Sequence, residues 1–153
     1  FIFQHFRYIF PEYLSIDSEF EIDTIDSEKK YVDFRLKSQS SHLLLELKLP
    51  TQKIMSSSKD RNNYYFVAGI NKAIIQLNRY YFSYKHSLYK EGRDYDVKTM
   101  LLVGWNAEFK NEEAKVNNDF ELARSMYNNI QLVTYSEILK KIKNLYSMVA
   151  QDS

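Results

Sequence analysis

Two apolar segments of this chain carry charged side chains, and no other feature limits the fold as strongly. The segment 31–34 contains Asp33, and the segment 43–48 contains Glu46 and Lys48. Both segments have the short apolar character of buried β-strands. An unpaired charge inside a sheet costs several kcal/mol. We therefore expect Asp33, Glu46 and Lys48 either to neutralise one another or to share a metal ion.

The pattern of apolar residues predicts a single α/β domain that spans residues 1–153. The expected elements, in order, are a helix at 1–14 that bends near Pro11, strands at 19–26, 31–37 and 42–49, an exposed loop at 52–63, a long helix at 64–90, a strand at 97–105, a helix at 112–128, a strand at 130–134 and a helix at 135–149. This αβββαβαβα order has no internal repeat. It implies a central mixed sheet with helices on both faces.

Composition excludes several classes of protein. The chain is 44% hydrophobic and 27% charged, which is ordinary for a soluble globular domain. No apolar run approaches the roughly 18 residues of a membrane span, and the first residues lack the features of an export signal. The absence of cysteine excludes disulfides and cysteine-based zinc sites. We expect a cytoplasmic protein with no membrane partner and, because the first residue is Phe1, a piece of a longer chain.

Charge is distributed unevenly, although the net charge is only +1. Residues 1–28 carry one basic residue against seven acidic ones, whereas residues 51–90 carry seven basic residues against Asp60 alone. This basic segment directly follows the segment with Glu46 and Lys48. It could therefore place phosphate contacts beside these two residues. The candidates for contacts with DNA are Lys53, Lys59, Arg61, Lys72, Arg79 and Tyr80. A basic face that meets only solvent is the alternative.

The alternation of side chains along a strand gives the three charged residues a possible chemistry. Glu46 and Lys48 project from the same face, while Leu47 points to the other. If Asp33 lies opposite Glu46 on the neighbouring strand, the two carboxylates and the Leu47 backbone carbonyl form an oxygen pocket suited to Mg²⁺ or Mn²⁺. Such an ion lowers the pKa of a bound water, and Lys48 would orient that water or stabilise charge on a phosphate. A cross-strand salt bridge is the alternative.

This arrangement resembles the PD-(D/E)XK nuclease superfamily, whose core has the order αβββαβ. Members carry an acid on the second core strand and (D/E)-x-K on the third, and Asp33, Glu46 and Lys48 stand at the matching positions. One departure is visible, because Val32 replaces the proline that gives the motif its name.

The long helix adds a second similarity. Gln76 and Tyr80 match the Gln-x-x-x-Tyr pattern that follows the Glu-x-Lys strand in RecB-like members, and residues four apart share one helix face. By position, Gln76 would contact the metal-bound water or a phosphate, as an accessory catalytic residue, and Tyr80 would pack or bond nearby. A surface glutamine beside a core tyrosine is the alternative.

Five short segments, in order over about residues 5 to 145, resemble the C-terminal nuclease domain of the Shedu family of bacterial anti-phage defence proteins. They are Asp33-Phe34, Glu46-Leu47-Lys48-Leu49-Pro50, Ala73-Ile74-Ile75-Gln76-Leu77-Asn78-Arg79-Tyr80, Leu102-Val103-Gly104 and Thr134-Tyr135-Ser136-Glu137-Ile138-Leu139. The resemblance implies a metal-dependent DNA endonuclease that protects a bacterium from phage. It also implies homo-oligomers and a regulatory N-terminal region in the same chain.

Two other functions remain open at this stage. One is a catalytically silent PD-(D/E)XK-fold module for DNA binding or oligomerisation, and the other is an unrelated α/β interaction domain in which the three charges only form salt bridges. The histidines His5, His42 and His86 lack the spacing of metal ligands. Glu12 is a candidate for an additional acid near the site or a solvated helix residue, and Trp105 for a cleft or a subunit contact.

Overall fold

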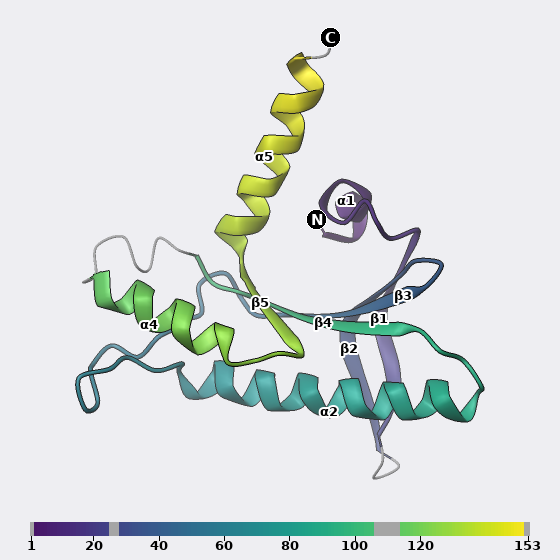
Figure 1. The fold of residues 1–153 in the computed structure, drawn as a ribbon, viewed down its shortest axis with the longest axis horizontal. Helices are drawn as coiled ribbons and strands as arrows, with labels where there is room; N and C mark the ends of the chain where they lie inside the picture. The colour runs from purple at the N-terminus through teal and green to yellow at the C-terminus, as the bar shows by residue number, and fades with distance from the viewer. Residues whose placement is uncertain (1, 25–27, 106–113, 152–153) are drawn as a thin grey trace.

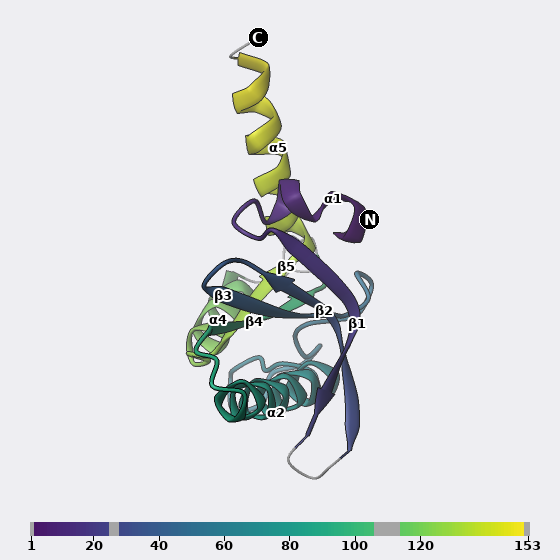
Figure 2. The same cartoon turned by 90° about the vertical axis from the view of Figure 1, so that its right-hand side faces the viewer.

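The computed structural model describes residues 2–24, 28–105 and 114–151, which form a sheet between two layers of helices (Figures 1 and 2). The elements are α1 (Ile2–Ile9), β1 (Ser15–Asp23), β2 (Lys29–Lys37), β3 (Ser41–Leu47), α2 (Ala68–Lys90), β4 (Asp96–Val103), α4 (Ala114–Ser125), β5 (Ile130–Thr134) and α5 (Tyr135–Gln151). Among these residues, no helix is long and apolar enough to cross a membrane.

The sheet has five strands in the order β1-β2-β3-β4-β5. The pairs β1–β2 and β2–β3 are antiparallel, whereas β3–β4 and β4–β5 are parallel. Parallel neighbours need a crossover, which α2 supplies between β3 and β4 and α4 supplies between β4 and β5. The expected mixed α/β sheet flanked by helices is confirmed.

Consecutive leucines of β3 pack on opposite faces of the sheet. Leu44 belongs to the apolar cluster beneath α2, with Ile74 and Leu77. Leu45 belongs to the cluster beneath α1 and α5, with Ile9 and Ile138. Both leucines are fully buried, which explains the continuous apolar run in the sequence. Because side chains alternate, residues 46 and 48 point to the α2 face.

Strand β2 bends sharply at Asp33. Val32 packs in the cluster beneath α2, whereas Phe34, two residues later, packs on the opposite face. The β1–β2 ladder has pairs on both sides of Glu19 and Asp33 but none between these two residues. Glu19 adopts a φ of 48°, in the left-handed region that is uncommon for residues other than glycine. The bend turns the distal half of the β1–β2 hairpin toward α2 (Figure 2).

The segment 52–63, expected to be an exposed loop, is partly buried. Ile54 and Met55 are 0% and 2% exposed and belong to the core beneath α2. A Cβ atom on Gly104, directly after β4, would approach the carbonyl oxygen of Gln52 to 2.8 Å. The expectation was wrong for the start of this loop because the glycine lets the backbone pack against the end of β4.

Some element boundaries also differ from expectation. The long helix begins at Ala68 rather than at 64, because Phe66 forms a β-bridge with Met55 and the Tyr64 N–H is bonded to Asp119. The first strand begins at Ser15 rather than at 19. The expected start of a helix at 112, and positions 25 and 26 of the first expected strand, lie outside the described residues.

His42 is a core residue. Its Nδ1 lies 2.7 Å from the Tyr84 hydroxyl, and its ring stacks on Tyr95 at a centroid distance of 4.2 Å. Burial, together with the nearby cations Arg35 and Lys37, lowers the pKa of His42 to about 4. His42 is therefore neutral at physiological pH and is held by aromatic packing. In the described part of the chain, no group of three or more His, Asp or Glu residues is placed to hold a metal ion by itself.

Candidate active site

Asp33 meets β3 where the β2–β3 ladder ends. The ladder runs to the pair Phe34–Leu45, so the next facing positions in this register are Asp33 and Glu46. The backbone N–H of Leu47 donates a hydrogen bond of 2.6 Å to Asp33 Oδ2. The carboxylate therefore takes the place of a strand carbonyl as the acceptor. The charge of Asp33 also acts on the Glu46 carboxyl, so the two side chains lie near each other.

Glu46 and Lys48 form an ion pair on the α2 face of the sheet. Lys48 Nζ lies 3.0 Å from Glu46 Oε1, and the two side chains are 22% and 10% exposed. This contact is part of the salt bridge that we considered as the alternative to a metal site. It also places an ammonium group beside the buried carboxylate of Glu46.

The electrostatics of the site oppose ionisation of Glu46. Burial raises the pKa of the Glu46 carboxyl, and the negative charge of Asp33 raises it further. Lys48 and the backbone of Asp33 lower the pKa but do not offset the two stronger effects. Glu46 therefore holds a proton more tightly than an exposed glutamate does, although Lys48 lies beside it.

The backbone of Lys48 is held on both sides. Its N–H donates to the Leu102 carbonyl oxygen at 2.9 Å, and its own carbonyl oxygen accepts a hydrogen bond of 2.8 Å from the Tyr135 hydroxyl. Tyr135 is the first residue of α5, which covers the opposite face of the sheet. The sequence motif contained Tyr135, but its contact with Lys48 spans 87 positions and left no signal in the spacing.

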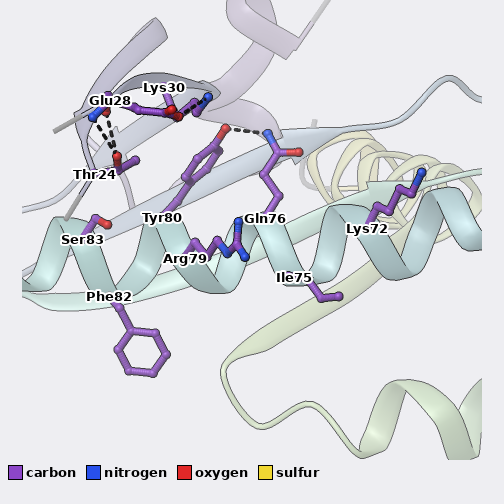
Figure 3. Close-up of a pocket in the computed structure, with 10 residues that line it drawn as sticks. All are labelled: Thr24, Glu28, Lys30, Lys72, Ile75, Gln76, Arg79, Tyr80, Phe82 and Ser83. Atoms are coloured by element: carbon purple, nitrogen blue, oxygen red, sulfur yellow. Dashed lines mark hydrogen bonds and ion pairs between the residues drawn. The ribbon is translucent and has the colours of Figure 1, made fainter. Parts of the chain in front are cut away.

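Gln76 and Tyr80 face each other on α2, where the Gln76 amide donates a hydrogen bond to the Tyr80 hydroxyl (Figure 3). Because α2 crosses between parallel strands, it runs antiparallel to β3. His42 contacts Tyr84, so these two residues lie at the same level. Glu46 lies four residues after His42, about 13 Å along the strand, and the same length of helix holds about nine residues. Gln76 thus lies near the level of Glu46. No hydrogen bond joins Gln76 to Asp33, Glu46 or Lys48 in the part of the chain that the structure describes.

A groove of about 810 Å³ lies between α2 and the end of the β1–β2 hairpin. Lys72 and Arg79 line it from α2, and Lys30 lines it from β2 (Figure 3). Lys30 is paired with Glu28 at 2.7 Å. Lys72 and Arg79 are exposed and have no ion-pair partner among the described residues. Gln76 and Tyr80 also line the groove, whereas the carboxylates of Asp33 and Glu46 do not.

The other proposed DNA contacts are arranged differently. Lys53, Lys59 and Arg61 are exposed on the loop before α2, where Lys53 is bonded to Ser57. None of the three lines the groove. Tyr80 is 3% exposed, so its ring belongs to the core and little more than its hydroxyl reaches the groove. The DNA-contact role of these residues stays a prediction.

The structure also gives the positions of Glu12 and Trp105. Glu12 lies in the turn after α1, where it is exposed, and α1 covers the face opposite Glu46. Trp105 is 39% exposed, and its ring lies 5.6 Å from the ring of Tyr135. Trp105 therefore borders the residue that holds the Lys48 carbonyl.

The motif that begins at Thr134 has a structural explanation. Thr134 Oγ1 accepts a hydrogen bond from the Glu137 N–H, and Glu137 Oε2 accepts one from the Thr134 N–H. This reciprocal capping box fixes the start of α5. Arg124 Nη1 lies 2.8 Å from Glu137 Oε1 and ties α4 to the same cap. Tyr135 is thus presented by a rigid helix terminus.

We expect Glu46→Gln to stabilise the metal-free protein at neutral pH. The folded protein holds the Glu46 pKa above its unfolded value, so stability is lost as the pH rises through the raised pKa. Urea unfolding in EDTA between pH 4.5 and 8 should show a gain that grows with pH to roughly 1 kcal/mol, the lower end of the range found when a whole buried ion pair is replaced by apolar side chains. Lys48 stays partly exposed, so water offsets the loss of its partner.

Glu137→Gln is the matched control. Burial alone would raise the pKa of Glu137, but the Thr134 N–H and the Arg124 guanidinium lower it overall. Its ionised form therefore stabilises the fold above the unfolded pKa, and Glu137→Gln should destabilise the protein at pH 7. A Glu46→Gln protein that is less stable than the parent at pH 7 would contradict this account of the site.

The comparisons with known proteins come from two sources. A search of curated proteins gives no significant match. The family model described as the C-terminal region of the Shedu protein SduA matches residues 1–139, which include Asp33, Glu46, Lys48 and Tyr135. This match covers most of the chain and agrees with the resemblance carried by the five short segments. The chain belongs to the Shedu family, as a member of its SduA C-terminal group.

Proposed function

We propose that this domain is a metal-dependent DNA endonuclease of PD-(D/E)XK type that acts as the effector of a Shedu defence protein. Shedu membership supports a defence-associated effector domain. The observation that carries the nuclease proposal is the placement of Asp33 beside Glu46, which is itself paired with Lys48. Two carboxylates can hold a divalent ion for phosphodiester hydrolysis, and an ammonium group beside them can stabilise charge on the phosphate.

The donor set fits a Mg²⁺ or Mn²⁺ ion that keeps part of its water shell. Mg²⁺ is commonly bound through one or two carboxylates together with waters and substrate phosphates. Asp33 and Glu46 supply two carboxylates, and burial and the charge of Asp33 raise the pKa of Glu46, two effects that a bound cation would oppose. Leu47 directs its N–H to Asp33, and in an extended strand the carbonyl of the same residue points to the same side.

Each residue of the candidate site has a separate role in this proposal. When bound, the ion supplies a water of lowered pKa and neutralises charge on the phosphate. Asp33 and Glu46 hold the ion, with the Leu47 carbonyl as a third oxygen. Lys48, released from its contact with Glu46, orients the attacking water or contacts the scissile phosphate. Gln76, at the level of Glu46 across the α2 face, contacts that water or a neighbouring phosphate.

The groove provides a path for the DNA backbone toward these residues. Its lining runs from Lys72 past Gln76 to Arg79, and Lys30 faces them from the hairpin. Lys72 and Arg79 are seven residues apart, which corresponds to about 10.5 Å along a helix. Lys72 and Arg79, which have no acidic partner among the described residues, suit contacts to phosphates, which position the DNA without reading its sequence.

A catalytically silent DNA-binding module is the competing function. The Lys48–Glu46 ion pair favours the silent module, because the Glu46 carboxylate already has the Lys48 ammonium group as its partner. The two functions differ in one measurable property, since only the nuclease requires Lys48 for turnover.

We expect purified protein to nick or cut supercoiled DNA with Mg²⁺ or Mn²⁺ and to be inactive in EDTA. Lys48→Ala should lower the single-turnover rate at least about 100-fold, the scale of losing one electrostatic contact to the reacting group. Lys140→Ala, on the exposed side of α5, is the matched control and should cut at the parental rate. Binding without metal-dependent cutting, unaffected by Lys48→Ala, would favour the silent module.

DNA affinity should depend on salt through the groove. Each lost phosphate contact lowers the slope of log K against log salt by about 0.9, so Lys72→Ala with Arg79→Ala should lower it by about 1.8. Fluorescence anisotropy with labelled duplex DNA in EDTA, from low to moderate NaCl, measures the slope without cleavage. If the double variant has the same slope as the parent and Lys140→Ala, the groove does not contact DNA.

A further inference from the structure

We propose that Tyr135 is a positioning residue for Lys48, and that its hydroxyl fixes the strand-end peptide from which Lys48 reaches the site. This inference rests on the proposed nuclease function, in which Lys48 must meet the reacting phosphate. The role is distinct from catalysis, because Tyr135 acts on the backbone of Lys48 from the opposite layer of the molecule.

The need for such a contact follows from where β3 ends. The strand ends at Leu47, so Lys48 lies one residue beyond it. On the β2 side, the paired residues stop at Leu45. On the β4 side, Leu102 accepts the Lys48 N–H. The Lys48 carbonyl is then fixed by the Tyr135 hydroxyl, which sets the plane of the peptide that follows Lys48.

Tyr135 is itself held firmly. Its N–H donates to the Gly104 carbonyl at 3.0 Å, so the start of α5 is attached to the end of β4. The Thr134–Glu137 capping box fixes the first turn of the helix. The Trp105 ring lies against the Tyr135 ring. A hydroxyl on a helix terminus fixed in these three ways can act as a rigid reference for Lys48.

The Tyr135 hydroxyl also lies within the electrostatic field of the site. Burial raises its pKa above the usual value for tyrosine, and the negative charge of Asp33 raises it further. Asp33 also raises the pKa of Glu46, so one carboxylate acts on both groups. The hydroxyl therefore remains protonated, and it remains a donor to Lys48 throughout the range in which cleavage would be assayed.

The test is Tyr135→Phe, which removes only the oxygen and leaves the ring to pack with α1 and α5. Small displacements of a reacting group can cost about 100-fold in rate. We expect the single-turnover rate of cleavage at saturating Mn²⁺ and enzyme to fall about 10-fold or more, while DNA affinity in EDTA changes less than twofold. Tyr146→Phe, exposed near the end of α5, is the matched control and should leave both quantities unchanged.

Amide hydrogen exchange of the metal-free protein gives a readout that does not depend on nuclease activity. In Tyr135→Phe, exchange at the Lys48 amide should accelerate about 10-fold relative to the parent and to Tyr146→Phe, while amides at the centre of β3 exchange as before. Unchanged exchange at Lys48 would show that the Tyr135 hydroxyl does not hold the Lys48 backbone, whether or not the parent cuts DNA. Accelerated exchange with an unchanged cleavage rate in an active parent would overturn the positioning role. A parent that does not cut DNA would contradict the proposed function alone.

Discussion

The hydrogen bond from the Leu47 N–H to Asp33 is the contact on which the site depends. It lies where the β2–β3 ladder stops and where β2 bends, so a carboxylate completes the pairing that a backbone carbonyl would otherwise make. The same bond joins Asp33 to the strand that carries Glu46, and it lies at the bend that turns the distal part of the β1–β2 hairpin toward α2. One interaction therefore links the register of the sheet, the convergence of charge and the groove along α2.

The buried carboxylates illustrate a conflict between stability and function. Glu137 is stabilised as an anion by Arg124 and the Thr134 N–H, so its charge supports the fold. Glu46 is buried beside Asp33, and its pKa is raised although Lys48 is within 3.0 Å. Strained electrostatics of this kind are common at functional sites, where a bound cation or substrate supplies the missing interaction. The contrast within one chain supports a functional reading of Glu46.

Much of the architecture could be predicted from the sequence, because apolar runs and their breaks report the burial of each face. The strand at 130–134 was predicted correctly, and so was the mixed sheet flanked by helices. Contacts between distant segments could not be predicted. The Tyr135–Lys48 bond, the packing of Gln52 against Gly104 and the bend at Asp33 depend on tertiary geometry, which short-range patterns do not encode. The exposed basic residues were visible, but only the fold shows that Lys72 and Arg79 share a groove.

The most direct test of the central claim is calorimetric titration of Mn²⁺ into the DNA-free protein, compared with Asp33→Asn and Asp119→Asn. Asp119, on α4, is the matched control, because its carboxylate also accepts a backbone N–H, that of Tyr64. The account predicts one ion bound by the parent and by Asp119→Asn, and none by Asp33→Asn. Equal binding by the parent and Asp33→Asn, or none by the parent, would contradict a metal site built on Asp33 and Glu46.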